Sequence, residues 1–213
     1  MGLDNLKIFY FVALVVAIIL HEISHGVVAL WFGDDTAKRA GRITLNPLPH
    51  VDPFGSVILP ALGALSGIPV IAWAKPVPVN PALVRNRRRN MLWVSLAGPA
   101  TNFILAFVTA LVARLLYDPT DVLAIIDYLY IFAFVNVFLG VFNFLPIPPL
   151  DGASLIERVL PERMLPGWYR YRMYGFAIVF VVAFFTPVLE WIIDPFQSAL
   201  LSFITHGNVS LTR

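Results

Sequence analysis

Long apolar runs separated by short polar stretches dominate the chain. Four runs reach the roughly 20 apolar residues that a membrane-spanning helix needs, and they are 6–32, 91–116, 122–145 and 174–193. A fifth apolar run, 54–74, contains Pro60, Gly63, Gly67 and Pro69, which interrupt regular helices. Because irregular backbone at membrane depth must be covered by protein or water, we expect 54–74 to re-enter the membrane and not to span it.

The composition indicates a membrane protein. Hydrophobic residues make up 59% of the 213 residues and charged residues only 13%, and the mean hydropathy is +0.79, which is too apolar for a soluble domain. We therefore predict an all-α polytopic membrane protein with about four to six transmembrane helices. It forms one domain, 1–213, with a core at 6–160 and a C-terminal helix and tail at 161–213. The net charge of +2 indicates no nucleic-acid partner.

The basic residues predict the orientation in the membrane. If 54–74 re-enters, 12 of the 15 Lys and Arg residues lie on one side, whereas a full span at 54–74 would divide them between both faces. Cytoplasmic loops are enriched in Lys and Arg, so this side is predicted to be cytoplasmic. The predicted location is the cell membrane, multi-pass, with the N-terminus outside. Residues 195–213 are compatible with an external tail, an interfacial helix or a short return.

The first apolar run carries three ionisable residues near its centre, which is costly in a bilayer and usually marks function. His21, Glu22 and His25 form the pattern H-E-x-x-H, in which the two histidines lie on one helical face, close enough to bind the same ion. The alternative is that neighbouring helices satisfy the two histidines, with Glu22 as their partner. Zinc accepts imidazole ligands, and since the chain has no cysteine, any further ligand must be histidine or carboxylate. Glu22 is placed to take a proton from the attacking water and to return it to the leaving amine.

A third ligand must come from another part of the chain, and Asp151 is the best candidate. It follows the apolar run 122–145, within the sequence Asn-Phe-Leu-Pro-Ile-Pro-Pro-Leu-Asp-Gly at 143–152. His21 lies about 24 Å along the first predicted helix, in its cytoplasmic half, and 122–145 ends on the cytoplasmic side, so both residues reach the same depth. The alternative is that Asp151 only caps the helix that follows.

Two polar segments carry further predictions. Residues 36–45, with Gly41 between polar and β-branched residues, are compatible with a short β-hairpin or with an ordinary polar loop. The edge of such a hairpin would bind an extended substrate by strand addition. His50 is either a loop histidine or a residue that lines the active-site cavity.

Three motifs in this order resemble the site-2 protease family of intramembrane zinc metalloproteases, which is peptidase M50-like. They are His-Glu-Ile-Ser-His at 21–25, Ala-Gly-Pro-Ala-Thr-Asn at 97–102 and the proline-rich sequence at 143–152. The segments 41–55 and 74–80 resemble a compact subgroup without PDZ or CBS domains. The resemblance covers about 14–159, and three spaced motifs are far more specific than H-E-x-x-H alone.

The resemblance implies one catalytic zinc ion, held by His21, His25 and Asp151, with Glu22 as the catalytic acid and base. It also implies that a transmembrane protein or peptide substrate is cleaved near the cytoplasmic face of the lipid bilayer. Such cleavage serves regulated intramembrane proteolysis or the clearance of membrane remnants. By the same resemblance, Asn143 holds the substrate backbone or the developing oxyanion, for which an amide donor is suited.

Asn102 is predicted to line the cavity or to support helix packing around Gly98 and Pro99.

Two alternatives for the whole chain come from other classes of protein. A membrane metal-ion transporter would more often spread its ligands along a pathway. A non-catalytic zinc-binding membrane protein would normally close its site with four protein ligands. The transporter alternative has no need of a glutamate beside the first histidine.

Overall fold

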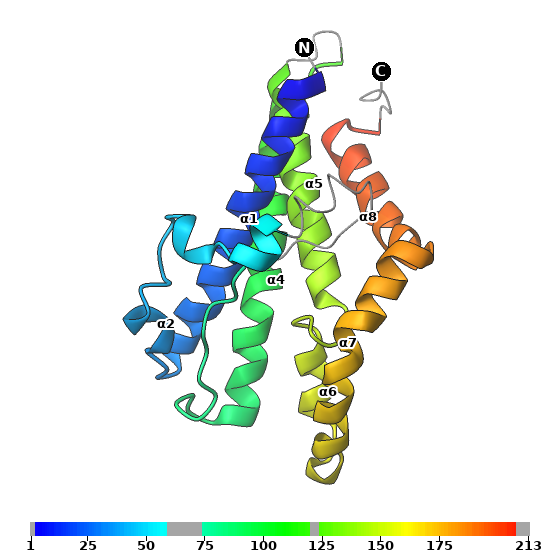
Figure 1. Ribbon diagram of the computed structural model, residues 1–213. Helices are drawn as coiled ribbons and strands as arrows, with labels where there is room; N and C mark the ends of the chain where they lie inside the picture. The colour runs from blue at the N-terminus through cyan, green and yellow to red at the C-terminus, as the bar shows by residue number, and fades with distance from the viewer. Residues whose placement is uncertain (1–2, 59–73, 120–123, 208–213) are drawn as a thin grey trace.

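The computed structural model describes residues 3–58, 74–119 and 124–207, and every regular element in these residues is a helix (Figure 1). The α-helices are α1 (Leu3–Trp31), α2 (Thr36–Arg39), α4 (Arg87–Leu116), α5 (Ala124–Phe144), α6 (Ala153–Val159), α7 (Leu165–Phe185) and α8 (Val188–Ile204). Three short turns of 3-10 or π-helix are η1 (Leu48–His50), η2 (Pro53–Ile58) and η3 (Glu162–Met164). The predicted all-α fold is confirmed for this part of the chain.

Among the described residues, three helices, α1, α4 and α5, are long and apolar enough to cross a membrane. They correspond to the predicted runs 6–32, 91–116 and 122–145. The three helices pack against one another, with α1 and α5 running in one direction and α4 in the other (Figure 1). Ala13 and Ala17 of α1 pack against Val135 and Leu139 of α5, and small side chains of this kind let membrane helices approach closely.

The predicted run 174–193 is wrong as an unbroken span. Helix α7 ends at Phe185 and α8 begins at Val188. Between them Thr186 has the extended backbone that a residue before proline prefers, so Pro187 divides the run. Residues up to Ile204 then continue as α8, and Leu200 and Ile204 of this helix pack in a buried apolar cluster that includes Ile126 of α5. Residues 195–204 are therefore helical, and the choice among an external tail, an interfacial helix and a short return stays a prediction.

The hairpin alternative for 36–45 is also wrong, because this segment begins with α2 and contains no strand. The Asp34 side chain accepts hydrogen bonds from the backbone N–H and the hydroxyl of Thr36, which favours the start of a helix there. Gly41 follows the helix in the left-handed conformation, with a φ of +65°. Most of the predicted re-entrant run 54–74 lies outside the described residues.

Candidate metal centre

Helix α1 places His21 and His25 one turn apart, against α4. Both side chains are buried, and their ring centroids lie 4.8 Å apart at an interplanar angle of 81°. The spacing of four residues accounts for this placement, because residues at i and i+4 project from the same face of a helix. The pair therefore presents two imidazole rings side by side inside the helical bundle.

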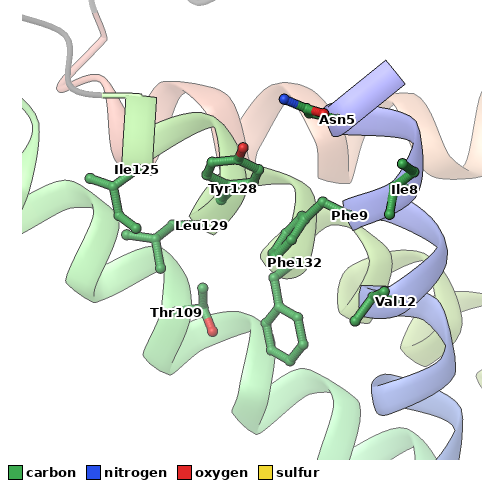
Figure 2. A pocket seen from close by; sticks show the side chains of 9 residues that line it. All are labelled: Asn5, Ile8, Phe9, Val12, Thr109, Ile125, Tyr128, Leu129 and Phe132. Carbon is green, nitrogen blue, oxygen red and sulfur yellow. The ribbon is translucent and has the colours of Figure 1, made fainter. Parts of the chain in front are cut away.

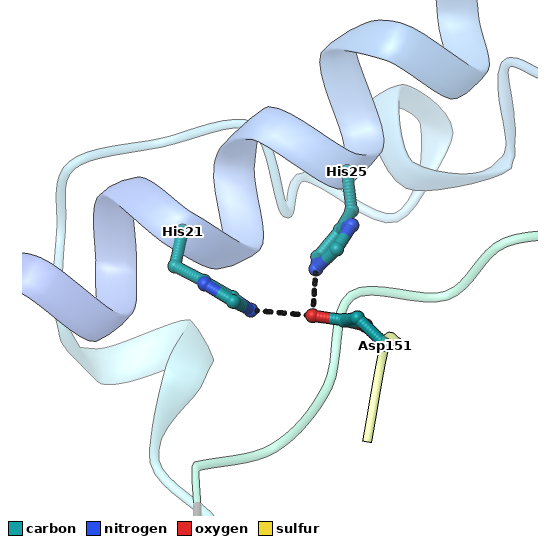
Figure 3. Close-up of side chains that lie close together, drawn as sticks. All are labelled: His21, His25 and Asp151. Carbon is teal, nitrogen blue, oxygen red and sulfur yellow. Dashed lines mark ion pairs between the residues drawn. The ribbon is translucent and has the colours of Figure 1, made fainter. Parts of the chain in front are cut away.

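Asp151 reaches the two histidines from the turn that follows α5 (Figure 3). Its Oδ2 atom lies 3.0 Å from Nε2 of His21 and 3.3 Å from Nε2 of His25. The next residue must be small, since a Cβ on Gly152 would lie 2.1 Å from the carbonyl oxygen of Phe144. The Asp-Gly pair thus lets the chain fold back tightly on the end of α5 and carry the carboxylate to α1. The three ligand atoms lie within 4.8 Å of one another.

The hydrogen bond of His25 defines the form of its ring. Its Nδ1 atom lies 2.7 Å from the carbonyl oxygen of Val94 on α4, and a carbonyl can only accept a hydrogen bond. Nδ1 therefore carries the proton in the neutral ring, and Nε2 presents a lone pair to the Asp151 carboxylate. Two electron-rich atoms in buried contact are unfavourable unless a proton or a metal ion joins them. This donor set of imidazole and carboxylate fits a zinc ion.

Gly98 of α4 leaves the space in which the ligands meet. A Cβ at this position would lie 2.5 Å from Nε2 of His21 and 2.5 Å from Nε2 of His25, so no larger residue fits beside the unshifted rings. One turn later on the same helix, Asn102 is completely buried, and its Oδ1 atom lies 2.6 Å from Nδ1 of His21. The motif at 97–102 thus forms one wall of the metal centre.

Glu22 is held from the other side. Its Oε2 atom accepts a hydrogen bond of 2.8 Å from the backbone N–H of Val77, in the segment 75–80, which has no regular secondary structure. The far end of this segment is tied to Asp34, which accepts a hydrogen bond of 2.6 Å from the N–H of Asn80. Burial opposes ionisation of Asp34, but the hydrogen bonds from Thr36 and Asn80 hold its pKa below the usual value.

Two cavities differ sharply in their relation to this centre. A polar cavity of about 240 Å³ extends to Asp151, and its wall includes Ser95 of α4 and Ser154 of α6. A larger hollow of about 530 Å³ lies between α1, α4 and α5 near the beginning of α1 (Figure 2). Its lining is mostly apolar and contains no group that commonly binds zinc, and of these two cavities it is the polar one that a residue of the metal centre lines.

The structure brings together His21, His25 and Asp151, as the sequence predicted. It places Asn102 against His21, a contact that the sequence did not indicate. Asn143 donates a hydrogen bond of 3.1 Å to the carbonyl oxygen of Leu139 on its own helix, and its predicted role toward substrate stays a prediction.

His50 is buried in η1, where its Nε2 atom lies 3.0 Å from the carbonyl oxygen of Thr44. Its role as a cavity-lining residue stays a prediction too. Sequence reasoning assigned Gly98 to helix packing and missed its contact with the two histidines, and it missed Val77 and Asn136 altogether. A signal existed for Asn136, because it is an amide in the otherwise apolar stretch 131–142.

Comparison with known proteins gives a consistent set of relatives. The family model "Peptidase family M50" matches residues 116–185, which include Asp151. "Putative zinc metalloprotease YwhC" of Bacillus subtilis is 38% identical over 88% of this chain and 85% of its own length. "Putative zinc metalloprotease Rip2" of Mycolicibacterium smegmatis is 34% identical over 91% of this chain and 75% of its own length. No solved structure matches the chain.

Proposed function

The chain belongs to peptidase family M50, and from this premise we propose that it is an intramembrane zinc metalloprotease. The observation that carries the proposal is the convergence of His21, His25 and Asp151 from two separate segments at one buried point. The zinc metalloproteases among its relatives support the choice of metal and of reaction. The substrate class that fits a site built on a membrane-spanning helix is a transmembrane protein or peptide.

In this proposal His21, His25 and Asp151 hold the zinc ion. When bound, the ion supplies a Lewis acid for the scissile carbonyl and for the attacking water. Glu22 accepts a proton from that water and later returns it to the leaving amine nitrogen. The N–H of Val77 keeps the Glu22 carboxylate oriented between these two proton transfers. Asn143 is proposed to donate its amide to the substrate backbone or to the developing oxyanion.

We propose that the site faces the cytoplasmic side of a multi-pass protein in the cell membrane. Arg87, at the start of α4, and Arg172 of α7 both line the polar cavity that extends to Asp151. Basic residues are typical of cytoplasmic loops, and a polar cavity can supply the water that hydrolysis consumes. We propose further that 1–213 is one catalytic domain. In this proposal the whole chain has four to six membrane segments.

Two features favour the protease over the alternatives. Within the described residues the metal-binding group has three protein ligands, whereas a structural zinc site usually has four. A metal-ion transporter needs no glutamate beside the first ligand, and here Glu22 has its own hydrogen bond that keeps it in place. A zinc protease would use both a ligand set of three residues and the Glu22 carboxylate.

The direct test compares the membrane proteomes of cells that produce the wild-type protein or the Glu22→Gln variant. We expect membrane-embedded protein stubs to accumulate with the variant, while metal analysis finds one zinc per chain in both proteins. Glu190→Gln is the matched control, because Glu190 is an exposed residue on α8. Equal processing of all stubs by the Glu22→Gln variant would contradict the proposal, and so would wild-type protein that retains no zinc.

A further inference from the structure

We propose that Asn136 of α5 is a positioning residue for the metal centre: acting through Asn102, it fixes the ring of His21 so that Nε2 offers its lone pair to the ion. This inference rests on the proposed zinc site. It concerns a residue that touches none of the three ligands in a described contact and that lies on a different helix from all of them. The direction of each hydrogen bond in a buried series fixes which nitrogen of His21 carries the lone pair.

The series begins at a backbone carbonyl. Nδ2 of Asn136 donates a hydrogen bond of 2.9 Å to the carbonyl oxygen of Phe132, one turn earlier on α5. A carbonyl oxygen cannot donate, so the side chain of Asn136 has only one acceptable orientation, with its nitrogen toward Phe132. Its Oδ1 atom must then face the neighbouring helix α4.

The orientation of Asn102 follows from that of Asn136. Nδ2 of Asn102 donates a hydrogen bond of 2.9 Å to Oδ1 of Asn136 and a longer one of 3.4 Å to the carbonyl oxygen of Ala17 on α1. Both partners are acceptors, so the nitrogen of Asn102 must point to them. Its Oδ1 atom is left facing Nδ1 of His21, at 2.6 Å.

The last step concerns the proton of His21. Because Oδ1 of Asn102 can only accept, Nδ1 of His21 must donate, and Nε2 of the neutral ring is left with the lone pair that a metal ion requires. A partner on the second ring nitrogen is a common way to fix the tautomer and orientation of a metal-binding histidine. In His25, the hydrogen bond from Nδ1 to the Val94 carbonyl likewise leaves the lone pair on Nε2. In His21, two amide side chains determine that Nδ1 is the donor.

Burial makes this series effective. Asn102 and Asn136 are both completely buried, so bulk water cannot replace a lost hydrogen bond or reverse the order of donors and acceptors. The series also joins α5, α4 and α1, which suits amides that hold membrane helices together. Helix association alone would not require each amide to point in one direction, whereas presentation of the His21 lone pair does.

The test measures zinc affinity by competition with a chromophoric chelator, using purified full-length protein. Asn136→Leu keeps the approximate volume and removes the amide. We expect zinc affinity to fall about tenfold, within the range typical of residues that support metal ligands. The visible absorption spectrum of the cobalt-substituted protein should also change, because the geometry around His21 is altered. If the wild-type protein binds no zinc, the proposed function fails; if both proteins bind zinc equally, only this inference fails.

A double substitution distinguishes positioning from a structural role. If Asn136 acts through Asn102, the Asn102→Leu, Asn136→Leu double variant should bind zinc no more weakly than Asn102→Leu alone. Additive losses would overturn the inference. Ile126→Ala is the matched control, because Ile126 is a fully buried residue of α5 in a different cluster, and its loss should lower stability without changing zinc affinity. If Asn136→Leu does not fold, Asn136→Ser is measured against the same criteria.

Discussion

The two sides of the metal centre are built in different ways. The inner side, Val94, Gly98 and Asn102, belongs to about two turns of helix α4 and lies against the two histidines. The outer side comprises Val77, in a segment without regular secondary structure, and Asp151, in a turn. The inner side is therefore rigid because of helical hydrogen bonds and packing, whereas the outer side depends on a few individual contacts.

This difference separates two tasks. The inner side holds the two imidazole rings, so in the proposed function it acts on metal binding. On the outer side, Asp151 completes the proposed ligand set and Val77 holds Glu22, the proposed acid and base, so one segment would act on metal binding and the other on proton transfer. We expect substitutions on the two sides to divide accordingly between zinc affinity and turnover.

The largest effect is expected for Asp151→Asn. An amide oxygen is a poorer ligand than a carboxylate, and the variant keeps the shape of the turn. Zinc affinity should fall more than about 100-fold, beyond the loss typical of residues that only support a ligand, and proteolysis should fall to background. Chelator competition and cleavage of an accumulated substrate measure the two quantities.

Asp194→Asn serves as the control for this substitution, because Asp194 is exposed on α8. It should leave both quantities unchanged. Zinc affinity that survives in Asp151→Asn would show that the outer side supplies no ligand, and the comparison of the two sides would then break down.

The next largest effect on zinc affinity is expected for Gly98→Ala, which tests the inner side. The new methyl group would lie 2.5 Å from Nε2 of both histidines, so the rings must move apart or α4 must retreat. Zinc affinity should fall about 10- to 100-fold, as for a displaced ligand shell. Gly167→Ala is a matched control, since that glycine of α7 has open space around its Cβ position. Unchanged zinc affinity in Gly98→Ala would contradict the described geometry.

The contrast between the sides also explains what the sequence could predict. The spacing of His21 and His25 is a local pattern, and the position of Asp151 follows from the order and length of the apolar runs. Both features could therefore be predicted from the sequence. The contacts of Gly98 and Asn136 depend on how α4 and α5 rotate against their neighbours, which no local pattern specifies. Val77 acts through its backbone N–H, so its side chain carries no signal.

Helix boundaries were predictable where composition alone determines them. The runs 91–116 and 122–145 differ from α4 and α5 by at most a few residues at each end. The break at Pro187 could have been anticipated from the residue itself, because proline disfavours helix at the preceding position. The start of α2 could not, since it depends on the side chain of Asp34, which also binds Asn80 from a distant part of the chain.

A smaller effect is expected for Val77→Pro on the outer side. Proline has no N–H, so Glu22 loses the hydrogen bond of 2.8 Å that orients it. Turnover should fall about tenfold, less than the full contribution of a general base, whereas zinc affinity stays within the error of measurement. Val77→Ala keeps the N–H and should retain most of the activity. A parallel loss of zinc in Val77→Pro would show that the two tasks are not separable.

The smallest effect is expected at Asp34, which anchors the outer segment from outside the membrane spans. Hydrogen bonds from Thr36 and Asn80 favour its ionised form in the folded protein and lower its pKa. A group with a lowered folded pKa contributes stability above its unfolded pKa, about 3.9, and this contribution is lost as the pH falls through the folded pKa.

Asp34→Asn should therefore lower the free energy of unfolding by about 1–3 kcal/mol at pH 7, because a buried carboxylate that accepts several hydrogen bonds is replaced by an amide. The difference from wild type should shrink as the pH falls below about 4. Thermal unfolding across this pH range measures both effects. Asp35→Asn is the adjacent control, because its ion pair with Arg39 is exposed and worth little. A constant difference at all pH values would mean that the charge of Asp34 does not hold segment 75–80 against α1.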